Sequence, residues 1–132
     1  MARNLSAHDL FVLTTRGLES VSRDEIADIH GVTLQKTGYR RVVFSYDNAD
    51  LTALMGIRTA DDLFVAVDEW SEITRPRATL DLIEDLSTQL ALESVIAPLR
   101  SVRAIPDEPV FSVTASFVGK RNYSSDEIKI AV

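Results

Sequence analysis

The stretch Asp9-Leu10-Phe11-Val12-Leu13-Thr14-Thr15-Arg16-Gly17-Leu18 decides the fold of this chain. Four consecutive apolar residues, 10–13, are typical of a strand that is buried on both faces. Gly17 interrupts the strand and can serve as the N-cap of a following helix. The apolar positions of that helix are Leu18, Val21, Ile26 and Ile29. Gly31 then predicts where the helix ends.

Three more strands and a second helix are predicted before residue 70. Residues 32–36 alternate as a half-buried strand should, and residues 41–46 form the return strand. Asn48 is expected to cap a helix that the segment 56–62 interrupts, and residues 63–67 form the fourth strand. The resulting order, β-α-β-β-α-β, is that of the ferredoxin-like split arrangement. The sequence therefore predicts an α+β protein whose first domain, residues 1–75, is ferredoxin-like.

A second, incomplete domain is expected over residues 76–132. Segment 71–78 is polar, contains Pro76 between two arginines, and is interpreted as a linker. Two apolar stripes at helical spacing follow. The first consists of Leu82, Ile83, Leu86 and Leu90, and the second of Leu92, Val95, Ile96 and Leu99. Pro98 is expected to kink or split the second helix.

The end of the chain predicts one strand and the start of one helix. Residues 110–117 alternate, with Phe111, Val113, Ala115 and Phe117 on one side. Ser124 and Glu127 have the spacing of a capping box at a helix N-terminus. Because one strand cannot complete a sheet-based layer, we expect the second domain to be truncated.

Composition limits the functions that this chain can have. It has 132 residues and no cysteine, which excludes disulfides and cysteine-based zinc sites and favours a reducing, cytoplasmic location. No apolar run approaches the ~18 residues of a membrane span, and no secretory signal is apparent. Acidic residues outnumber basic ones by 20 to 14. This balance argues against a domain that binds nucleic acid through its overall charge.

No motif for catalysis or metal binding is present. The chain lacks a phosphate-binding P-loop, a G-x-S-x-G nucleophile elbow and a G-x-G-x-x-G dinucleotide loop. Its two histidines, His8 and His30, share no ligand spacing. Paired acids such as Asp61-Asp62 are interpreted as solvated surface groups. We therefore expect neither catalytic nor metal-binding residues in this chain.

One basic group of residues is a candidate for contact with RNA. It consists of Arg100, Arg103, Lys120, Arg121, Asn122 and Tyr123. The lysine and arginines supply charge, Asn122 a hydrogen bond, Tyr123 a face for base stacking, and the helix N-terminus at Ser124 N–H groups for a phosphate. The alternative is an ordinary polar loop in which Tyr123 packs against its own helix.

Short segments of the chain resemble the THUMP-containing RNA methyltransferases. Segment 11–19 resembles the opening strand, turn and helix of that family, although Arg16 stands where the family commonly has proline. Segment 54–61, which contains Ile-Arg-Thr-Ala, is similar to the family's Leu-Arg-Thr-Ala segment. Segments 111–113 and 119–128 resemble a later strand, loop and helix. The order and spacing of these segments carry the resemblance.

The resemblance implies a ferredoxin-like domain followed by the first part of a THUMP domain, which contributes to binding of structured RNA, typically tRNA. A separate C-terminal Rossmann-type domain would bind S-adenosylmethionine and methylate the exocyclic amine of a guanine. That catalytic half is absent here, because the sequence has no Asn/Asp-Pro-Pro-aromatic motif. The alternative is a stand-alone interaction or regulatory module that forms a homodimer through a strand edge or sheet face.

Overall fold

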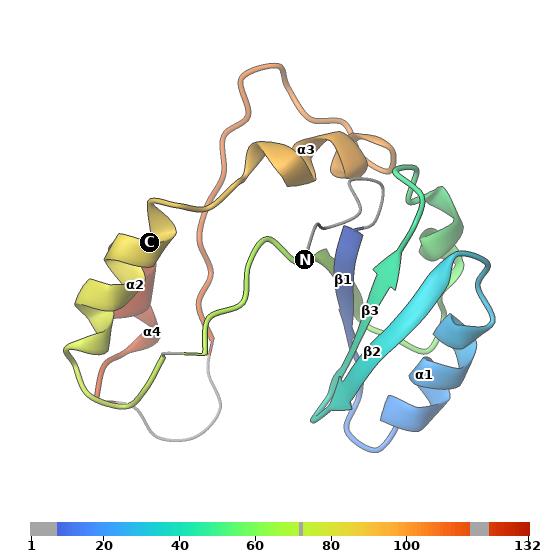
Figure 1. Ribbon diagram of the computed structural model, residues 1–132, viewed down its shortest axis with the longest axis horizontal. Coiled ribbons are helices and arrows are strands. Elements are labelled where there is room, and N and C mark those ends of the chain that lie inside the picture. Colours follow the sequence, from blue (N-terminus) through green and yellow to red (C-terminus); the bar gives the residue numbers. More distant parts are fainter. Residues whose placement is uncertain (1–7, 72, 117–121) are drawn as a thin grey trace. The chain divides into compact units, whose positions relative to one another are not determined.

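The computed structural model describes residues 8–71, 73–116 and 122–132, which form two compact units (Figure 1). Unit 1 comprises residues 8–67 and 92–105. Unit 2 comprises residues 68–91 and 106–132, apart from those outside the described ranges. Segment 92–105, which the sequence analysis placed in the second domain, thus belongs with the first. The reason lies in its contacts, because Val102 packs against the core of unit 1 and Ser101 Oγ accepts a hydrogen bond from Leu51 N (2.9 Å).

Unit 1 is built on a four-stranded antiparallel sheet. Its strands are β1 (His8–Leu13), β2 (Val32–Gly38), β3 (Arg41–Tyr46) and β4 (Asp62–Val65), in the order β2-β3-β1-β4. Helix α1 (Glu19–Ala27) lies against one side of this sheet (Figure 1). The bounds of the strands lie within about two residues of the predicted ones, and those of β3 coincide with the prediction.

The main hydrophobic cluster of unit 1 lies on the side of the sheet that α1 covers, and Val43 is buried on the other side. Every second residue of β1 and β3 points toward this cluster, because side chains alternate along a strand. The completely buried residues are Leu10, Val12, Ile26, Val42 and Phe44. The prediction that β1 is buried on both faces is wrong, since Phe11 and Leu13 are only half-buried. Helix α1 buries Ser22 and Ile26 and leaves Leu18 and Val21 exposed.

The predicted second helix is a short 3-10 helix, η1 (Thr52–Gly56). Asn48 Oδ1 accepts a hydrogen bond from Asp50 N (2.9 Å), so its side chain closes a local turn instead of capping an α-helix. The chain becomes extended at Ile57. The helix is therefore only five residues long. Its tight 3-10 turn buries Leu54.

Unit 2 consists of two packed helices and irregular segments. Helices α2 (Thr79–Ser87) and α4 (Ser125–Ala131) lie side by side (Figure 1). The capping box at the start of α4 is confirmed. Helix α3 (Glu93–Arg100), in unit 1, continues through Pro98 and is not split. None of the helices in the described ranges is long and apolar enough to cross a membrane.

The strand predicted over residues 110–117 is not formed in residues 110–116, and Phe117 lies outside the described residues. Val110 is 96% exposed and Phe111 is 71% exposed. The part of unit 2 that the structure describes contains no other strand. A strand needs a neighbour for its backbone hydrogen bonds, so alternation alone does not produce one here.

Glu25 on α1 fixes the loop that leads into β4. Its carboxylate accepts hydrogen bonds from Thr59 Oγ1 (2.7 Å), Thr59 N (3.0 Å) and Arg58 N (3.0 Å). Ser22 Oγ donates to Thr59 O (2.9 Å) and adds a second link between helix and loop. The hydrogen bond from the Thr59 side chain is the main reason why the pKa of Glu25 lies below its usual value of 4.5.

Replacing Glu25→Gln is expected to lower the stability of unit 1 by about 0.5–1 kcal/mol at neutral pH, a modest effect because solvent screens the site. Since folding lowers the pKa of Glu25, its stabilisation is present above about pH 4.5 and is lost as the pH falls through the folded-state pKa. Thermal unfolding from pH 7 to pH 3 should therefore show the gap between the two proteins closing. Asp24→Asn, on the same helix, is the control; a gap that stays constant with pH would contradict this role.

Candidate nucleic-acid interface

Two of the predicted RNA-contacting residues, Asn122 and Tyr123, lie in unit 2 and are bound to the segment before α2. Asn122 N donates a hydrogen bond to Arg75 O (3.0 Å), and Tyr123 OH donates to Thr74 O (2.7 Å). The Arg77 guanidinium donates to Asn122 O (3.1 Å). The segment interpreted as a linker is thus a fixed neighbour of the predicted loop, although more than forty residues separate them in sequence.

Tyr123 does not offer a stacking surface. Its side chain is only 5% exposed, and its hydroxyl group is used in the bond to the backbone of Thr74. A base would need an open ring face, which this burial removes. Tyr123 instead packs inside unit 2 and is bonded to the segment before α2.

Two N–H groups at the start of α4 are bonded within the chain itself. Ser124 Oγ accepts from Glu127 N (3.2 Å), and Glu127 Oε1 accepts from Ser124 N (3.1 Å). Arg77 donates to both carboxylate oxygens of Glu127. The bond from Arg77 is the main reason why the pKa of Glu127 is lowered, and the same pair raises the pKa of Arg77. A carboxylate therefore stands where the predicted phosphate would bind.

The remaining predicted residues are divided between the units. Arg100, at the end of α3, and Arg103 are exposed on unit 1. Lys120 and Arg121 lie outside the described residues, directly before Asn122 in the sequence. The described residues of the predicted group thus fall into two pairs, Asn122 with Tyr123 in unit 2 and Arg100 with Arg103 in unit 1.

Arg75 is a candidate that sequence reasoning missed. It is exposed, and its carbonyl group holds the backbone of Asn122. The signal in the sequence was the pair of arginines around Pro76. The structure gives the two arginines different roles, since Arg77 pairs with Glu127 whereas Arg75 presents its side chain at the surface.

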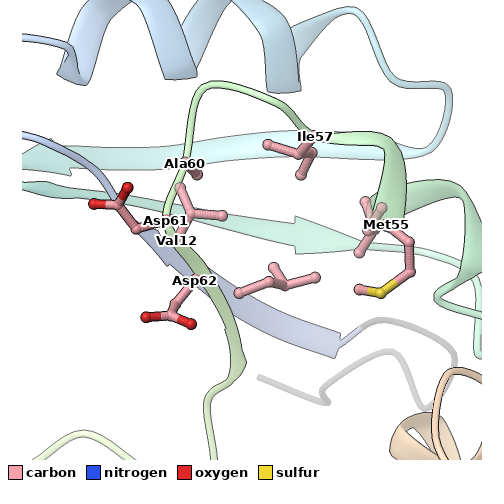
Figure 2. A pocket seen from close by; sticks show the side chains of 8 residues that line it. Val12, Met55, Ile57, Ala60, Asp61 and Asp62 are labelled. Atoms are coloured by element: carbon pink, nitrogen blue, oxygen red, sulfur yellow. The ribbon is translucent and has the colours of Figure 1, made fainter.

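A small hollow beside the loop 57–62 of unit 1 is unsuited to nucleic acid. It has a volume of about 160 Å³ and a lining that is polar and apolar in equal parts. Figure 2 shows the carboxylates of Asp61 and Asp62 at one side of it and the Met55 side chain at the other. Both acidic residues are exposed, and two carboxylates at the rim would repel a phosphate. The candidate interface therefore lies at the basic segments and not at this hollow.

Tyr123→Phe tests whether this residue packs or stacks. The change keeps the ring but leaves Thr74 O without its donor, so unit 2 should lose about 1 kcal/mol of stability. Thermal or chemical unfolding followed by a probe in unit 2 measures this loss. Tyr39→Phe, at an exposed tyrosine, is the matched control and should leave stability unchanged. Equal stability of Tyr123→Phe and the parent protein would refute the packing role.

Comparison with known proteins finds likeness at the level of fold. No protein-family model matches the sequence, and no curated protein matches it. A structure described as a predicted N6-adenine-specific DNA methylase from Listeria monocytogenes superposes with a TM-score of 0.72 at 20% identity. A structure described as a possible methylase from Clostridium difficile gives 0.71 at 19% identity.

The likeness extends over nearly all of this chain but over a minority of its neighbours. The matches cover 98% and 95% of this chain, and 32% and 30% of the Listeria and Clostridium chains respectively. The chain therefore has the fold of about one third of each of these larger proteins.

Proposed function

We propose that this chain is the substrate-placing region of a methyltransferase that depends on S-adenosylmethionine and acts on RNA, with unit 1 as a ferredoxin-like domain and unit 2 as part of a THUMP domain. The observation that carries the proposal is the shared fold over 98% of the chain with a structure described as a methylase, of which the chain spans only 32%. Because this sequence has no catalytic motif, the chemistry would belong to another part of the protein.

The role of the region is geometric. A module that holds a structured RNA at a fixed distance from a catalytic pocket lowers the entropic cost of bringing the base to the methyl donor. The Listeria neighbour is described as acting on the N6 amine of adenine in DNA. The family resemblance of this chain indicates the exocyclic amine of a guanine in tRNA. Both targets are exocyclic base amines, and we propose the RNA target for this chain.

The proposed RNA contacts are Arg75, Lys120, Arg121 and Asn122 in unit 2, with Arg100 and Arg103 in unit 1. The hydrogen bond between Asn122 N and Arg75 O supports the first group, because it holds Arg75 beside Asn122, which directly follows the other two cations in the sequence. Arginine and lysine neutralise phosphates, and the net charge of −6 restricts contact to such local basic groups. The Tyr123–Thr74 hydrogen bond and the Arg77–Glu127 ion pair hold the segment that contains Arg75 at the start of α4.

Replacing Arg75, Lys120 and Arg121 together by alanine should weaken tRNA binding and flatten its dependence on salt. Each phosphate contact that is lost reduces the slope of log K against log salt concentration by about 0.7–0.9. Fluorescence anisotropy with labelled tRNA at several salt concentrations measures both quantities. The experiment uses this chain and the longest natural polypeptide that contains it.

The matched control is Arg23→Ala, because Arg23 is exposed on α1 of unit 1 and pairs only weakly with the adjacent Asp24 (3.3 Å). This variant should bind tRNA as the parent does. An unchanged affinity and slope for the triple variant would remove these residues from the interface. Tighter binding of a DNA duplex than of tRNA would contradict the proposed substrate.

A further inference from the structure

Strand β4 forms one edge of the unit 1 sheet, and in the described part of the chain no strand pairs with its outer side. In an antiparallel pair, alternate residues turn their N–H and C=O groups toward the partner strand. Ala66 N donates to Asp9 O (2.8 Å), so the backbone groups of Ala66 and of Phe64, two residues earlier, face β1. Leu63 and Val65, at the alternate positions, turn theirs outward. The outer edge of β4 therefore offers hydrogen-bonding groups to a further strand.

An aromatic ring is exposed on the side of this edge that faces away from α1. The ring of Phe64 stacks on that of Phe11 in β1, with centroids 5.0 Å apart and an angle of 17° between their planes. Because Phe11 covers one face of the Phe64 ring, the other face is turned away from β1, and Phe64 is 40% exposed. The Arg41 guanidinium, 5.7 Å from the centroid of the Phe11 ring, restricts this stack before any partner binds. An aromatic side chain opposite Phe64 on an added strand would extend the stack.

The hollow beside the loop 57–62 lies on the other side of the same edge. Leu63 of β4 is part of its lining and packs against the core cluster, so the hollow is on the core side of the strand. Leu54, Met55 and Ile57 also line it, and Figure 2 shows Met55 and Ile57 away from the two aspartates. A cavity of about 150 Å³ can hold a benzene molecule. A volume of about 160 Å³ is therefore large enough for one aliphatic side chain opposite Leu63 on an added strand.

A carboxylate lies at the next position of the edge. Asp62 pairs in register with Leu13 and lies two residues before Phe64, so the two side chains are on the same side of the sheet. Asp62 is exposed. A cation opposite Asp62 on an added strand would form a cross-strand pair of opposite charges. Three consecutive residues of the edge thus each match one kind of side chain.

We propose that the outer edge of β4 binds an extended segment of a partner protein with the sequence aromatic, aliphatic, lysine or arginine. The segment adds to the sheet as an antiparallel strand, the pairing that is slightly more stable per residue. Its aromatic residue lies opposite Phe64, its aliphatic residue opposite Leu63 and its cation opposite Asp62. Backbone hydrogen bonds supply affinity, and the three side chains supply specificity. The inference goes beyond the proposed methyltransferase function and does not rest on it.

Charge favours a cationic segment over RNA and over a second copy of the chain. The carboxylates of Asp61 and Asp62 at this edge would repel a phosphate. Two copies that paired through β4 would set Leu63 opposite Val65 and Asp62 opposite Ala66, which leaves Asp62 without a cation. Each copy also carries a net charge of −6, so two copies repel each other. A cationic segment is instead attracted by the same net charge.

The test uses a fluorescent peptide, Ac-Thr-Thr-Tyr-Leu-Lys-Thr-amide, whose tyrosine, leucine and lysine take the positions opposite Phe64, Leu63 and Asp62. Anisotropy is measured with this chain at up to about 1 mM, because so small a contact binds weakly. The peptide should bind, and replacing its lysine by glutamate should weaken binding about fivefold or more. Asp62→Lys should reverse this preference between the two peptides. Asp24→Lys, a change of the same size and sign on α1, should leave it unchanged.

Methylation of single peptide amides tests the backbone hydrogen bonds. Methylation at the leucine removes the N–H group that faces Leu63 and should weaken binding about tenfold or more. Methylation at the tyrosine, whose N–H group points away from β4, should change binding by less than about threefold. Thermal unfolding of Asp62→Lys and Asp24→Lys confirms that these exposed substitutions leave the fold intact.

Three results with the peptides would overturn the proposal. The lysine peptide could fail to bind at the highest concentration, Asp62→Lys could fail to reverse the preference, or the two methylated peptides could bind alike. Displacement of the bound peptide by tRNA would assign the edge to RNA, and displacement by self-association of the chain would assign it to a second copy. Either result would equally overturn the proposal. Loss of tRNA binding on changing Arg75, Lys120 and Arg121 bears on the proposed function and leaves the peptide site unaffected.

Discussion

The burial of one face of a four-stranded sheet beneath a single helix is the constraint on which unit 1 depends. Leu10 and Val12 from β1 meet Val42 and Phe44 from β3, and Ile26 of α1 closes over them. Because strands present alternate residues to opposite sides, this choice sends Phe11 and Phe64 to the other side. Glu25 then ties the same helix to the loop before β4. The position of Phe11 and Phe64 on the other side of the sheet is therefore a consequence of which residues fill the core.

Unit 2 depends on a different interaction, which is the pairing of polar groups between its two segments. Its apolar core is small, and the packing of α2 on α4 is reinforced by bonds to backbone carbonyl groups, such as that from Tyr123 OH to Thr74 O. Arg77 links the start of α2 to Glu127 in the first turn of α4. These bonds hold Arg75 and Asn122 beside each other despite the acidic balance of the chain.

Local patterns in the sequence predicted those helix ends and strands that depend only on residues close together in the chain. The capping box needs only the spacing between Ser124 and Glu127, and the strand from Arg41 to Tyr46 needs only its apolar residues and a turn before it. The same reasoning failed where tertiary partners decide. Residues 111–116 alternate but have no neighbouring strand in the described chain. Helix η1 ends at Gly56, because the chain becomes extended at Ile57 on its way to β4. Helix propensity does not predict this end.

The candidate interface could be predicted only in part for the same reason. Lysine and arginine near position 120 are visible in any sequence, but the hydrogen bond that brings Arg75 to Asn122 joins residues 47 positions apart and leaves no periodic signal. Tyr123 was ambiguous from its type, because tyrosine serves equally as a stacking surface and as a packed ring with a polar tip. Its buried ring and satisfied hydroxyl resolve that ambiguity. Charge identifies residues that could bind a phosphate, whereas their packing decides which side chains are available. Arg75 and Arg77 flank the same proline, yet Arg77 pairs with Glu127 and Arg75 is exposed.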